Sequence, residues 1–419
     1  MKKIIIIILI VIATIIFNLD NIRIFLRSNL SHNSKIFIKE LFFGKQYIEE
    51  IKTYRLLNYN QKALPQTQFE NIELKKIKLE IGETTSSHYN AVKNTNIKSK
   101  KFFLETINEN VLIFTFDGEI KIINFLPNLK IETIRSNLKN FNLYSVLGTA
   151  LIEDEIFVSI SVKDQFNKCT YLNILKADYN NTNLQFKKIY ANEKCMTNTL
   201  GGRIVPYTHI NTKGFLITTG ASDKEKYLAQ DYNSDFGKIL FFSLDGFSKK
   251  IFSLGHRNPQ GLLVEDSIIL STEHGPYGGD EINLIKFNEN YGFPISSYGD
   301  TYFFEKILDK REEYEFKKNH FEFMEPIFSF VPSIGISEII KLPENFSKYW
   351  QNDFLIASLN ARSIFRISFD INFTKIKYLE KIYIGERVRD ISYNSKLNLI
   401  ILALEDTGSL GLIYSPNIN

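Results

Sequence analysis

Short runs of hydrophobic residues separated by polar turns dominate the chain from about residue 100 onward. The clearest example is the run 111–116, which is followed by Asp117-Gly118 and by a second apolar run at 119–123. An Asp-Gly pair between two such runs is typical of a tight β-hairpin, because both residues tolerate the backbone conformations of the turn. No segment of this region has the long helical period of an amphipathic helix. The pattern therefore predicts antiparallel strands.

The same layout of strand, turn, strand and return strand recurs, although without a tight sequence period. Six such units are found, around 111–123 and at 147–190, 202–254, 261–285, 326–384 and 388–414. Repeated small antiparallel sheets around one axis form a β-propeller, which leaves few exposed sheet edges. We therefore expect an all-β fold in which residues 100–419 form a six-bladed propeller. An irregular pair of β-sandwiches is the alternative.

The first 30 residues have a different pattern, typical of an export signal. Lys2 and Lys3 precede an apolar run at 4–17 that only Thr14 interrupts. A basic start and a short apolar stretch are typical of a secretory signal. The run is shorter than the roughly 20 residues that span a bilayer comfortably. Because no small-x-small pair follows the run, we expect an uncleaved anchor helix rather than a cleaved signal peptide. A helix buried in the protein core is the alternative.

This reading divides the chain into three segments. Residues 1–30 are the signal peptide or membrane anchor, 31–99 a stalk and lead-in segment, and 100–419 the propeller. Two short helices are possible near residues 39–57 in the stalk. The two lysines at the start would stay in the cytoplasm. We therefore expect the body in the periplasm, tethered to the inner membrane, or secreted if the signal is cleaved.

Composition and charge exclude several classes of protein. Hydrophobic residues make up 44% of the chain and charged residues 23%, which is typical of a globular protein and not of a disordered one. Lys and Arg number 51 against 47 for Asp and Glu, without a long basic run, so a nucleic-acid partner is not expected.

The chain has two cysteines, Cys169 and Cys195. In an oxidising compartment such a pair can form one disulfide, and we expect it here. Two unrelated buried thiols are the alternative. Two cysteines alone cannot make a zinc site, and no histidine accompanies them at ligand spacing.

Three polar motifs interrupt the strand pattern in the second half of the chain. They are Gly255-His256-Arg257-Asn258-Pro259-Gln260-Gly261, then Glu273-His274-Gly275-Pro276-Tyr277-Gly278-Gly279-Asp280-Glu281-Ile282-Asn283, then Asn290-Tyr291-Gly292-Phe293-Pro294. Composition alone identifies them as polar loops between strands. Polar side chains beside glycine and proline in rigid loops suit ligand binding.

In this order and at this spacing, the three motifs resemble those of the glucose/sorbosone dehydrogenase family. Weaker matches are Gly201-Gly202-Arg203-Ile204-Val205, Gly237-Lys238-Ile239-Leu240, Asp245-Gly246, Glu325-Pro326 and Arg387-Val388-Arg389-Asp390. The resemblance is good over residues 200–415 and weak over 100–200. It implies an exported six-bladed propeller that oxidises aldoses or sorbosone with pyrroloquinoline quinone (PQQ) and calcium, and passes the electrons to an acceptor in the envelope.

The resemblance also assigns a cofactor site. PQQ is a planar tricarboxylate with an ortho-quinone, and arginine makes strong charged hydrogen bonds to carboxylates. Arg387 and Arg389 are then expected to clamp the carboxylates. Arg257 and Asn258 are expected beside the quinone oxygens, where negative charge develops on reduction. Supporting positions in the loops are Gln260, Asp280 and Glu281.

A calcium site is implied by the same resemblance. The backbone carbonyls of Gly275 and Pro276 would hold the ion, because calcium prefers oxygen ligands. The bound ion would polarise the quinone. For Asp280 and Glu281, taken without the surrounding motif, the alternative is a solvent-exposed turn.

Three positions depart from the family pattern. The family's H-x-G-G-R motif opens with a histidine, which removes the proton of the sugar hydroxyl. Thr199 stands at this position here. The carboxylate that orients this histidine is replaced by Ala221, and the lysine of an S-L-K pattern by Asn360. Asparagine keeps hydrogen bonding but loses the positive charge.

These departures leave three hypotheses open. The chain is an active dehydrogenase with a base at another position, a non-catalytic relative that keeps a sugar- or cofactor-binding pocket, or a structural propeller. Among the histidines, His274 is the better substitute base. His209 is expected in a hairpin turn on the wrong side of a strand, and His256 in a motif loop without a catalytic role. Surface positions are expected for His32, His88 and His320.

Overall fold

The computed structural model describes residues 72–90, 93–164, 166, 168–180, 182–245, 248–300 and 317–416. The predicted anchor at 1–30, the possible helices of the stalk and His32 lie outside the described residues. Within the described ranges, no helix has both the length and the apolar character needed to cross a membrane.

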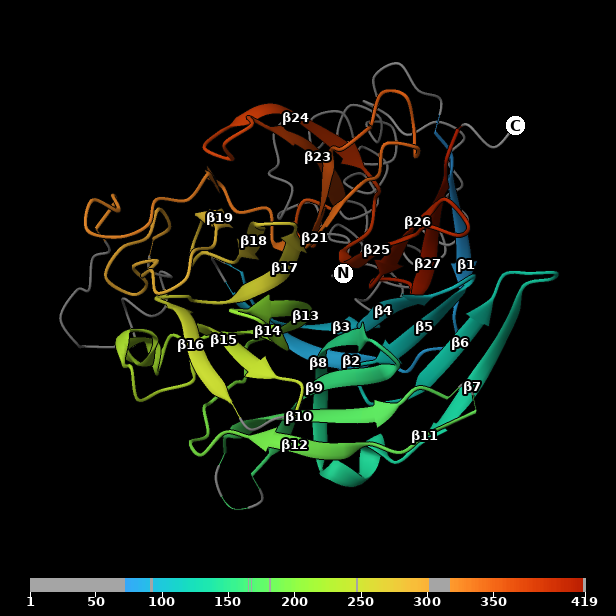
Figure 1. Cartoon of the computed structure of the whole chain (residues 1–419), viewed down its shortest axis with the longest axis horizontal. Coiled ribbons are helices and arrows are strands. Elements are labelled where there is room, and N and C mark those ends of the chain that lie inside the picture. The colour runs from blue at the N-terminus through green and yellow to red at the C-terminus, as the bar shows by residue number, and fades with distance from the viewer. Residues whose placement is uncertain are drawn as a thin grey trace, which may run out of the picture. The chain divides into compact units, whose positions relative to one another are not determined.

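Six antiparallel sheets form the blades of a propeller (Figure 1), which confirms the predicted all-β, six-bladed fold. Each blade begins with an inner strand: β4 (Phe102–Ile107), β8 (Leu143–Ile152), β13 (Gly201–His209), β17 (Pro259–Glu265), β21 (Ile336–Lys341) and β25 (Val388–Asn394). Each inner strand contacts the next around a common axis, and β25 contacts β4. The ring of blades is therefore closed. We number the blades I to VI in this order.

The remaining strands complete the blades in chain order. Blade I adds β5 (Asn110–Thr115), β6 (Ile120–Asn124), β7 (Lys130–Ser136) and β11 (Asn183–Leu184), the last parallel to β7; blade II adds β9 (Glu155–Lys163), β10 (Thr170–Asp178) and β12 (Lys187–Ala191). Blade III adds β14 (Thr212–Thr219), β15 (Lys238–Ser243) and β16 (Lys249–Leu254); blade IV adds β18 (Ile268–Glu273), β19 (Asp280–Leu284) and β20 (Phe328–Phe330). Blade V adds β22 (Phe354–Ser358), β23 (Ser363–Phe369) and β24 (Ile376–Tyr383), and blade VI adds β26 (Leu399–Leu404) and β27 (Ser409–Tyr414).

The β5–β6 hairpin shows how the sequence determines a blade. The two strands pair antiparallel, as the Asp117-Gly118 turn predicts, and Gly118 adopts a positive φ of 84°. β5 is buried along most of its length without alternation of polar residues. Leu112 and Phe114 pack with residues of blade II, while Val111 and Ile113 pack with residues of blade VI. Both faces of the strand are therefore covered, which explains its continuous hydrophobic run.

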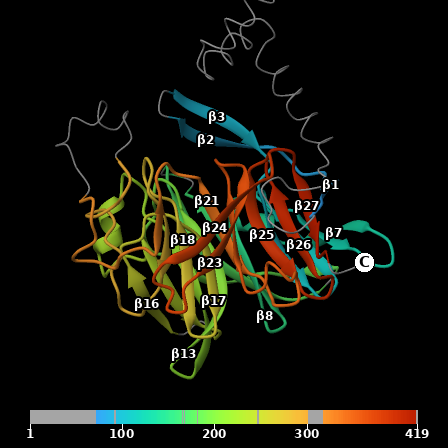
Figure 2. The ribbon, with the colours of Figure 1, turned by 90° about the horizontal axis from the view of Figure 1, so that it is seen from above.

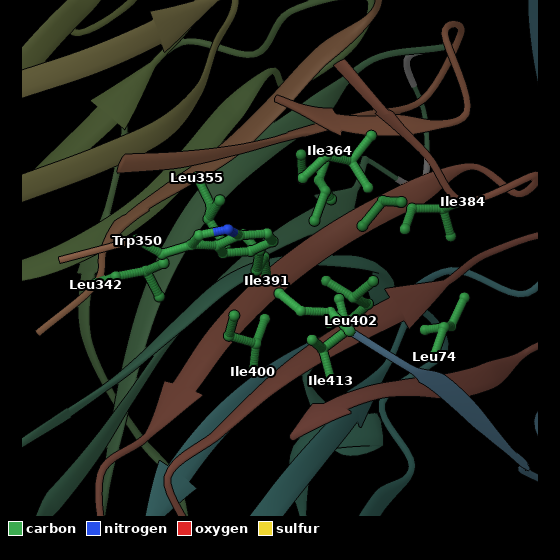
Figure 3. Packing of buried hydrophobic residues seen from close by; sticks show 14 of the residues in the cluster. Leu74, Leu342, Trp350, Leu355, Ile364, Ile384, Ile391, Ile400, Leu402 and Ile413 are labelled. Carbon is green, nitrogen blue, oxygen red and sulfur yellow. The ribbon is translucent and has the colours of Figure 1, made fainter. Parts of the chain in front are cut away.

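Blade VI is completed by a strand from the predicted lead-in segment. Strand β1 (Leu74–Lys78) pairs antiparallel with β27, so the first described strand closes the ring against the last. Figure 3 shows Leu74 beside Ile413 and Leu402 in a cluster that also contains Trp350 of blade V. The propeller thus includes residues well before position 100.

Two strands lie in other blades than the expected units predict. Strand β11, within the unit expected at 147–190, pairs with β7 of blade I. Strand β20 was expected in the fifth unit, at 326–384, but it pairs with β19 and completes blade IV. A long excursion, from residue 285 to 327, separates β19 from β20. Hydrophobic alternation cannot show to which sheet a strand returns after such an excursion, because pairing is decided by tertiary packing.

Two strands lie outside the blades. β2 (Thr84–Asn90) and β3 (Lys93–Ser99) form a two-stranded hairpin of their own (Figure 2). The helical elements of the described chain are two short 3-10 turns, η1 (Leu138–Phe141) and η2 (Lys226–Gln230). The blades are consequently joined by loops. The first polar motif lies between blades III and IV, and the second and third lie within blade IV, after β18 and after β19.

The closing strand gives a stability prediction. Leu74→Ala removes a side chain that is 1% exposed and leaves a cavity between β1 and β27, so it should lower the free energy of unfolding by about 2–5 kcal/mol. Urea denaturation measures this loss. Leu129→Ala, at a position that is 48% exposed, is the control and should change the same quantity by less than about 1 kcal/mol. Equal effects of the two substitutions would contradict the role of β1 in closing the ring.

Candidate functional site

Charged side chains meet at one end of the propeller axis. Each inner strand is the first strand of its blade along the chain. All six inner strands therefore run in the same direction along the axis and begin at the same face. Residues near these starting points come from distant parts of the sequence: Lys101, Arg203, Arg257, Gln260, Arg387 and Arg389. We call this end of the propeller the axial face.

A chain of hydrogen bonds crosses three blades at the axial face. The side-chain oxygen of Asn258 accepts hydrogen bonds from the backbone N–H of Gly201, at 3.2 Å, and from the amide of Gln260, at 2.8 Å. The Gln260 side-chain oxygen accepts from Nη1 of Arg389, at 3.3 Å. Three predicted site residues, Asn258, Gln260 and Arg389, are therefore brought together by contacts between blades IV and VI.

Arg387 and Arg389 are both buried and share one carboxylate. Nε of Arg389 lies 2.7 Å from Oε2 of Glu405, and Nε of Arg387 lies 3.4 Å from Oε1 of the same residue. Burial alone would raise the pKa of Glu405, but the two guanidinium groups hold it well below its usual range. Two positive charges thus face one negative charge in this pair of contacts.

Arg203 extends the network to blade V. Its Nε lies 2.8 Å from Oε2 of Glu338, and its Nη1 lies 3.0 Å from Oδ1 of Asp390. Burial raises the pKa of Glu338 to about 7, although Arg203 opposes the shift, and burial also raises the pKa of Asp390. Arg203 also donates to the backbone carbonyl of Gln260, at 2.7 Å.

Arg257 makes a bidentate ion pair that the sequence did not predict. Its Nη2 lies 3.1 Å from each carboxylate oxygen of Asp223, and its Nη1 donates to the carbonyl of Gly275 at 2.9 Å and of His274 at 3.3 Å. Asp223 lies in the loop after β14 and is half-buried. Bidentate geometry of this kind fixes a guanidinium firmly.

The contacts of Arg257 bear on the predicted calcium site. A guanidinium already lies against the carbonyl of Gly275, and a calcium ion there would face that positive charge at close range. Within the described ranges, no three His, Cys, Asp or Glu side chains are grouped so as to hold a metal ion. In this arrangement, the Gly275 carbonyl already accepts a hydrogen bond from Arg257 and does not fit a calcium ion.

Asp280 and Glu281 occupy different environments within the second motif. Oδ1 of Asp280 accepts from the backbone N–H of Gly275, at 3.1 Å, and from Oγ of Ser333, at 2.7 Å. Oδ2 accepts from the backbone N–H groups of Ile334 and Ile336, both at 3.0 Å. Asp280 therefore joins the motif loop to blade V, which is a structural support.

Glu281 is buried near a second carboxylate, that of Glu273. Burial and this neighbour raise the pKa of Glu281 well above its usual value. A cavity of about 10 Å³ lies here, lined among others by Arg257, Glu273, His274 and Glu281. That volume suits about one water molecule. A ligand the size of a quinone cofactor or a sugar does not fit in this cavity.

The three departures from the family motifs are each tied into the fold. The Thr199 hydroxyl is 2.7 Å from that of Thr170, and its backbone N–H also bonds to Thr170. Ala221 is fully buried, and its N–H donates to the carbonyl of Arg257 at 2.8 Å. Asn360 is exposed and donates to the carbonyl of Ser333 at 3.4 Å. Neither Thr199 nor Ala221 supplies a proton acceptor comparable to a histidine with its carboxylate.

Cys169 and Cys195 form a disulfide with an S–S distance of 2.13 Å and a Cα–Cα distance of 5.6 Å. Next to it, Thr170 and Met196 pair as an isolated bridge. The disulfide therefore fastens the segment after β12, which carries Thr199, to the start of β10. This segment leads directly into β13 and the axial face.

The histidines differ widely in their surroundings. His209 ends β13, eight residues after Gly201, and is buried near Phe241, Phe252 and Phe287. At about 3.3 Å per residue it lies roughly 26 Å from the axial face, too far to act there.

His256 is buried between a carboxylate and a hydroxyl. Its Nδ1 is 3.0 Å from Oε2 of Glu273, and its Nε2 is 2.9 Å from Oγ of Ser253. With both ring nitrogens engaged, His256 holds the first motif against β18. This is a structural role.

Unlike His256, His274 has a ring nitrogen, Nε2, that is buried without a hydrogen-bond partner among the described residues, as have His209 at Nε2 and His320 at Nδ1. Burial lowers its pKa, although Asp280 opposes the shift, so the ring is neutral at pH 7. A neutral imidazole with a free nitrogen can accept a proton. His274 is therefore the histidine of the axial loops with that capacity.

The prediction that His320 lies on the surface is wrong. Its side chain is 2% exposed, with Nε2 3.9 Å from Oε1 of Glu281 and its ring 5.1 Å from that of Tyr298. The excursion between β19 and β20 carries His320 back over Glu281, which the local sequence does not indicate. The side-chain environment of His88 is not described.

Several residues of the axial face were missed from the sequence. Asp223, Glu405 and Lys101 belong to no motif that we singled out. A usable signal existed for Lys101, because it immediately precedes the first strand of a blade, just as Arg387 precedes β25. Position within the repeat, and not the local motif, was the informative feature.

Comparisons with known proteins agree with this architecture. A family model described as Glucose / Sorbosone dehydrogenase matches residues 152–412. Aldose sugar dehydrogenase YliI of Escherichia coli (strain K12) is 28% identical over 236 residues, which are 52% of this chain and 60% of that protein. Quinoprotein glucose dehydrogenase B of Acinetobacter calcoaceticus is 42% identical over 84 residues, 17% of this chain and 18% of that protein. The matches thus span less than two thirds of either relative.

Solved structures share the fold. A glucose dehydrogenase superposes with a TM-score of 0.65 at 20% identity, covering 79% of this chain and 99% of that one. The apo form of the soluble aldose sugar dehydrogenase of Escherichia coli gives 0.61 at 19% identity, covering 80% and 99%. The PQQ-bound aldose sugar dehydrogenase of Streptomyces coelicolor gives 0.58 at 17% identity, covering 84% and 99%. At these identities the likeness establishes the shared fold.

The disulfide supports a testable statement about stability. Replacing Cys169 and Cys195 together by serine opens a loop of about 27 residues and should lower the free energy of unfolding by about 3 kcal/mol. Chemical denaturation of the oxidised protein measures the difference. Reducing agent should destabilise the natural protein by a similar amount and leave the double variant unchanged. If reduction destabilises both proteins equally, the disulfide is not the cause.

Proposed function

The chain belongs to the glucose/sorbosone dehydrogenase family, and from that premise we propose that it binds PQQ at the axial face and acts as a PQQ-dependent sugar dehydrogenase. The observation that carries the proposal is the convergence of Arg203, Arg387 and Arg389 from two blades at one end of the axis. Buried arginines at a convergent, partly polar site suit an anionic ligand.

The charges present fit the chemistry of the proposed cofactor. PQQ carries three carboxylates and a quinone, whereas Arg387 and Arg389 share the single carboxylate of Glu405. A cofactor carboxylate would therefore find guanidinium N–H groups that this one partner does not saturate. Arginine is suited to the task because its fork of donors matches a carboxylate in geometry as well as in charge.

The side chains around Arg257 would position the reacting end. Asn258 presents an amide that Gly201 and Gln260 hold in place. Arg257 is fixed by Asp223 and by the carbonyl of Gly275. When bound, PQQ would accept a hydride from C1 of the sugar, with the proton of the C1 hydroxyl passing to a base. We derive no step through calcium, because Arg257 already lies against the Gly275 carbonyl.

A second candidate function is a non-catalytic propeller that retains a sugar- or cofactor-binding pocket. The observation that favours it is the absence of a base at the family's position, where Thr199 is bonded to Thr170. Ala221 offers no carboxylate to orient a base. Both candidates require the same pocket, and they differ in turnover.

The envelope location remains part of the proposal. It is supported by the disulfide, since such bonds persist in oxidising compartments, and by the basic and apolar start of the sequence. An electron acceptor in the envelope would reoxidise the cofactor. The N-terminal segment would provide the tether to the inner membrane.

A PQQ titration tests the binding half of the proposal. We expect PQQ to bind the natural protein, and Arg257→Ala to weaken the affinity by about 10- to 100-fold because a charged hydrogen-bond donor is lost. Isothermal calorimetry measures both affinities. Arg135→Ala, on the exposed strand β7, removes the same charge elsewhere and should leave the affinity unchanged. Equal affinities for all three proteins would place the binding site away from Arg257.

Addition of an aldose panel with an artificial electron acceptor then separates the two candidates. Turnover would establish an enzyme whose base is not at position 199. Binding of PQQ without turnover would establish the non-catalytic candidate. Failure to bind PQQ would contradict both forms of the cofactor proposal.

Restoring the lost base gives a second prediction. Thr199→His combined with Ala221→Asp recreates a histidine and its orienting carboxylate, and general base catalysis contributes about 10²- to 10⁴-fold. We therefore expect faster reduction of bound PQQ by an aldose in single-turnover absorbance measurements. Thr199→His alone is the control and should gain less, because the imidazole lacks its partner. If the double variant binds PQQ but gains nothing, the missing base does not limit the reaction.

A further inference from the structure

We propose that Lys101 is a further ligand-binding residue of the axial face, where its ammonium group binds a carboxylate or similar anionic group of the ligand and supplies the positive charge that Asn360 lacks. The identity of the ligand as PQQ rests on the proposed function. The anion subsite itself rests on the contacts of Lys101 and can be tested without the cofactor.

The start of β4 is held firmly against blade VI. The backbone N–H of Lys100 donates to the carbonyl of Glu405 at 2.9 Å, and the backbone N–H of Leu104 donates to Oδ2 of Asp390 at 2.8 Å. Lys101 lies between these two anchors. Its backbone is therefore fixed beside β25, which carries Arg389 and which Arg387 immediately precedes.

The ammonium group of Lys101 is oriented by aromatic rings and not by a counter-ion. Nζ lies 5.2 Å from the ring centroids of both Phe103 and Phe116. The Phe103 ring also lies 5.0 Å from the guanidinium carbon of Arg203. In the part of the chain that the structure describes, no oxygen accepts a hydrogen bond from Lys101 Nζ. The side chain is also partly exposed, so a ligand can reach it.

Three other lysines with little exposed surface have acceptors for their ammonium groups. Lys76 lies 2.8 Å from Glu386, and Lys121 lies 3.0 Å from Glu119. Nζ of Lys238 donates to three backbone carbonyls, those of Leu228, Ala229 and Phe236. A cation held in place without an acceptor, as at Lys101, is the arrangement expected for a subsite that an anion completes.

The charges facing Lys101 explain why it is sensitive to an anion. They are Arg387 and Arg389 from blade VI, Glu405 from the turn after β26 in the same blade, and Arg203 from blade III. Burial and the positive charge of Arg389 lower the pKa of Lys101 to about 7, although Glu405 opposes the shift. An anionic ligand would offset the surrounding positive charge and raise the pKa of Lys101. Lys101 should therefore take up a proton when the ligand binds near pH 7–8.

Asn360 does not provide a charge at this face. It lies in the turn between β22 and β23, exposed, with its amide directed to the carbonyl of Ser333. Lys101 comes instead from blade I, which follows blade VI around the ring. The positive charge that replaces the family's lysine therefore comes from another blade, where no local sequence motif marks it.

The experiment uses two probes, PQQ and benzene-1,3,5-tricarboxylate, with the full-length protein in calorimetry at pH 6.5 and 8.5. Lys101→Met should weaken binding of the probes by about 10- to 100-fold at pH 6.5. Lys130→Met, which removes an exposed lysine of β7 in the same blade, should have no effect.

Lys101→Arg separates charge from packing. Because arginine stays protonated, this variant should bind within about twofold of the natural protein at pH 6.5 and more tightly than it at pH 8.5. In the natural protein the affinity should fall as pH rises through 7, since the free lysine loses its proton. That dependence should be absent in both Lys101→Met and Lys101→Arg.

The outcomes distinguish this inference from the proposed function. Lys101-dependent binding of the tricarboxylate without binding of PQQ would overturn the cofactor and keep the anion subsite. Binding of PQQ that is unchanged in Lys101→Met would keep the cofactor and overturn the subsite. Binding of neither probe at millimolar concentration would overturn both.

Discussion

The guanidinium group of Arg203 joins most of the propeller at its axis. It is held by Glu338 of blade V and Asp390 of blade VI, donates to the backbone of Gln260 in blade IV, and lies over the Phe103 ring of blade I. A buried guanidinium is tolerated only when its hydrogen-bonding groups are satisfied, so removal of one partner would leave an uncompensated charge. This constraint fixes the relative position of five blades, including its own, and with them the loops of the axial face.

The same network concentrates positive charge at the axial face, where we propose that the ligand binds. Inner strands that begin at one face force arginines from separate blades together, and carboxylates such as Glu405 offset only part of their charge. An incoming anion gains from that excess, while the neutral sugar of the proposed reaction would not. The structure keeps the cations of the axial face, whereas Thr199 and Ala221 provide neither the base nor its partner, so the proposed binding and the proposed chemistry depend on different residues.

The sequence was sufficient for the propeller and for the motif loops, and insufficient where distant segments return. The 111–123 hairpin follows from an Asp-Gly turn between apolar runs, which is local information. The pairing of β1 with β27, the return of β20 to blade IV and the burial of His320 depend on long excursions whose end points are set by packing. The sequence does not indicate Lys101 for a related reason, since the charged residues around it lie on other blades. Motif resemblance locates residues that a family shares, and not those by which one member compensates for a change.

The contacts of Arg257 differ from those that the motif resemblance implies. The motif places it beside a quinone and places a calcium ion at the neighbouring Gly275 carbonyl. In the structure its guanidinium lies between that carbonyl and the carboxylate of Asp223. Two positive groups cannot share one carbonyl at close range without strong repulsion, so an ion at Gly275 would require Arg257 to turn away. Asp223 opposes that turn through a bidentate pair, and this contact couples the loop after β14 to whatever binds at the axial face.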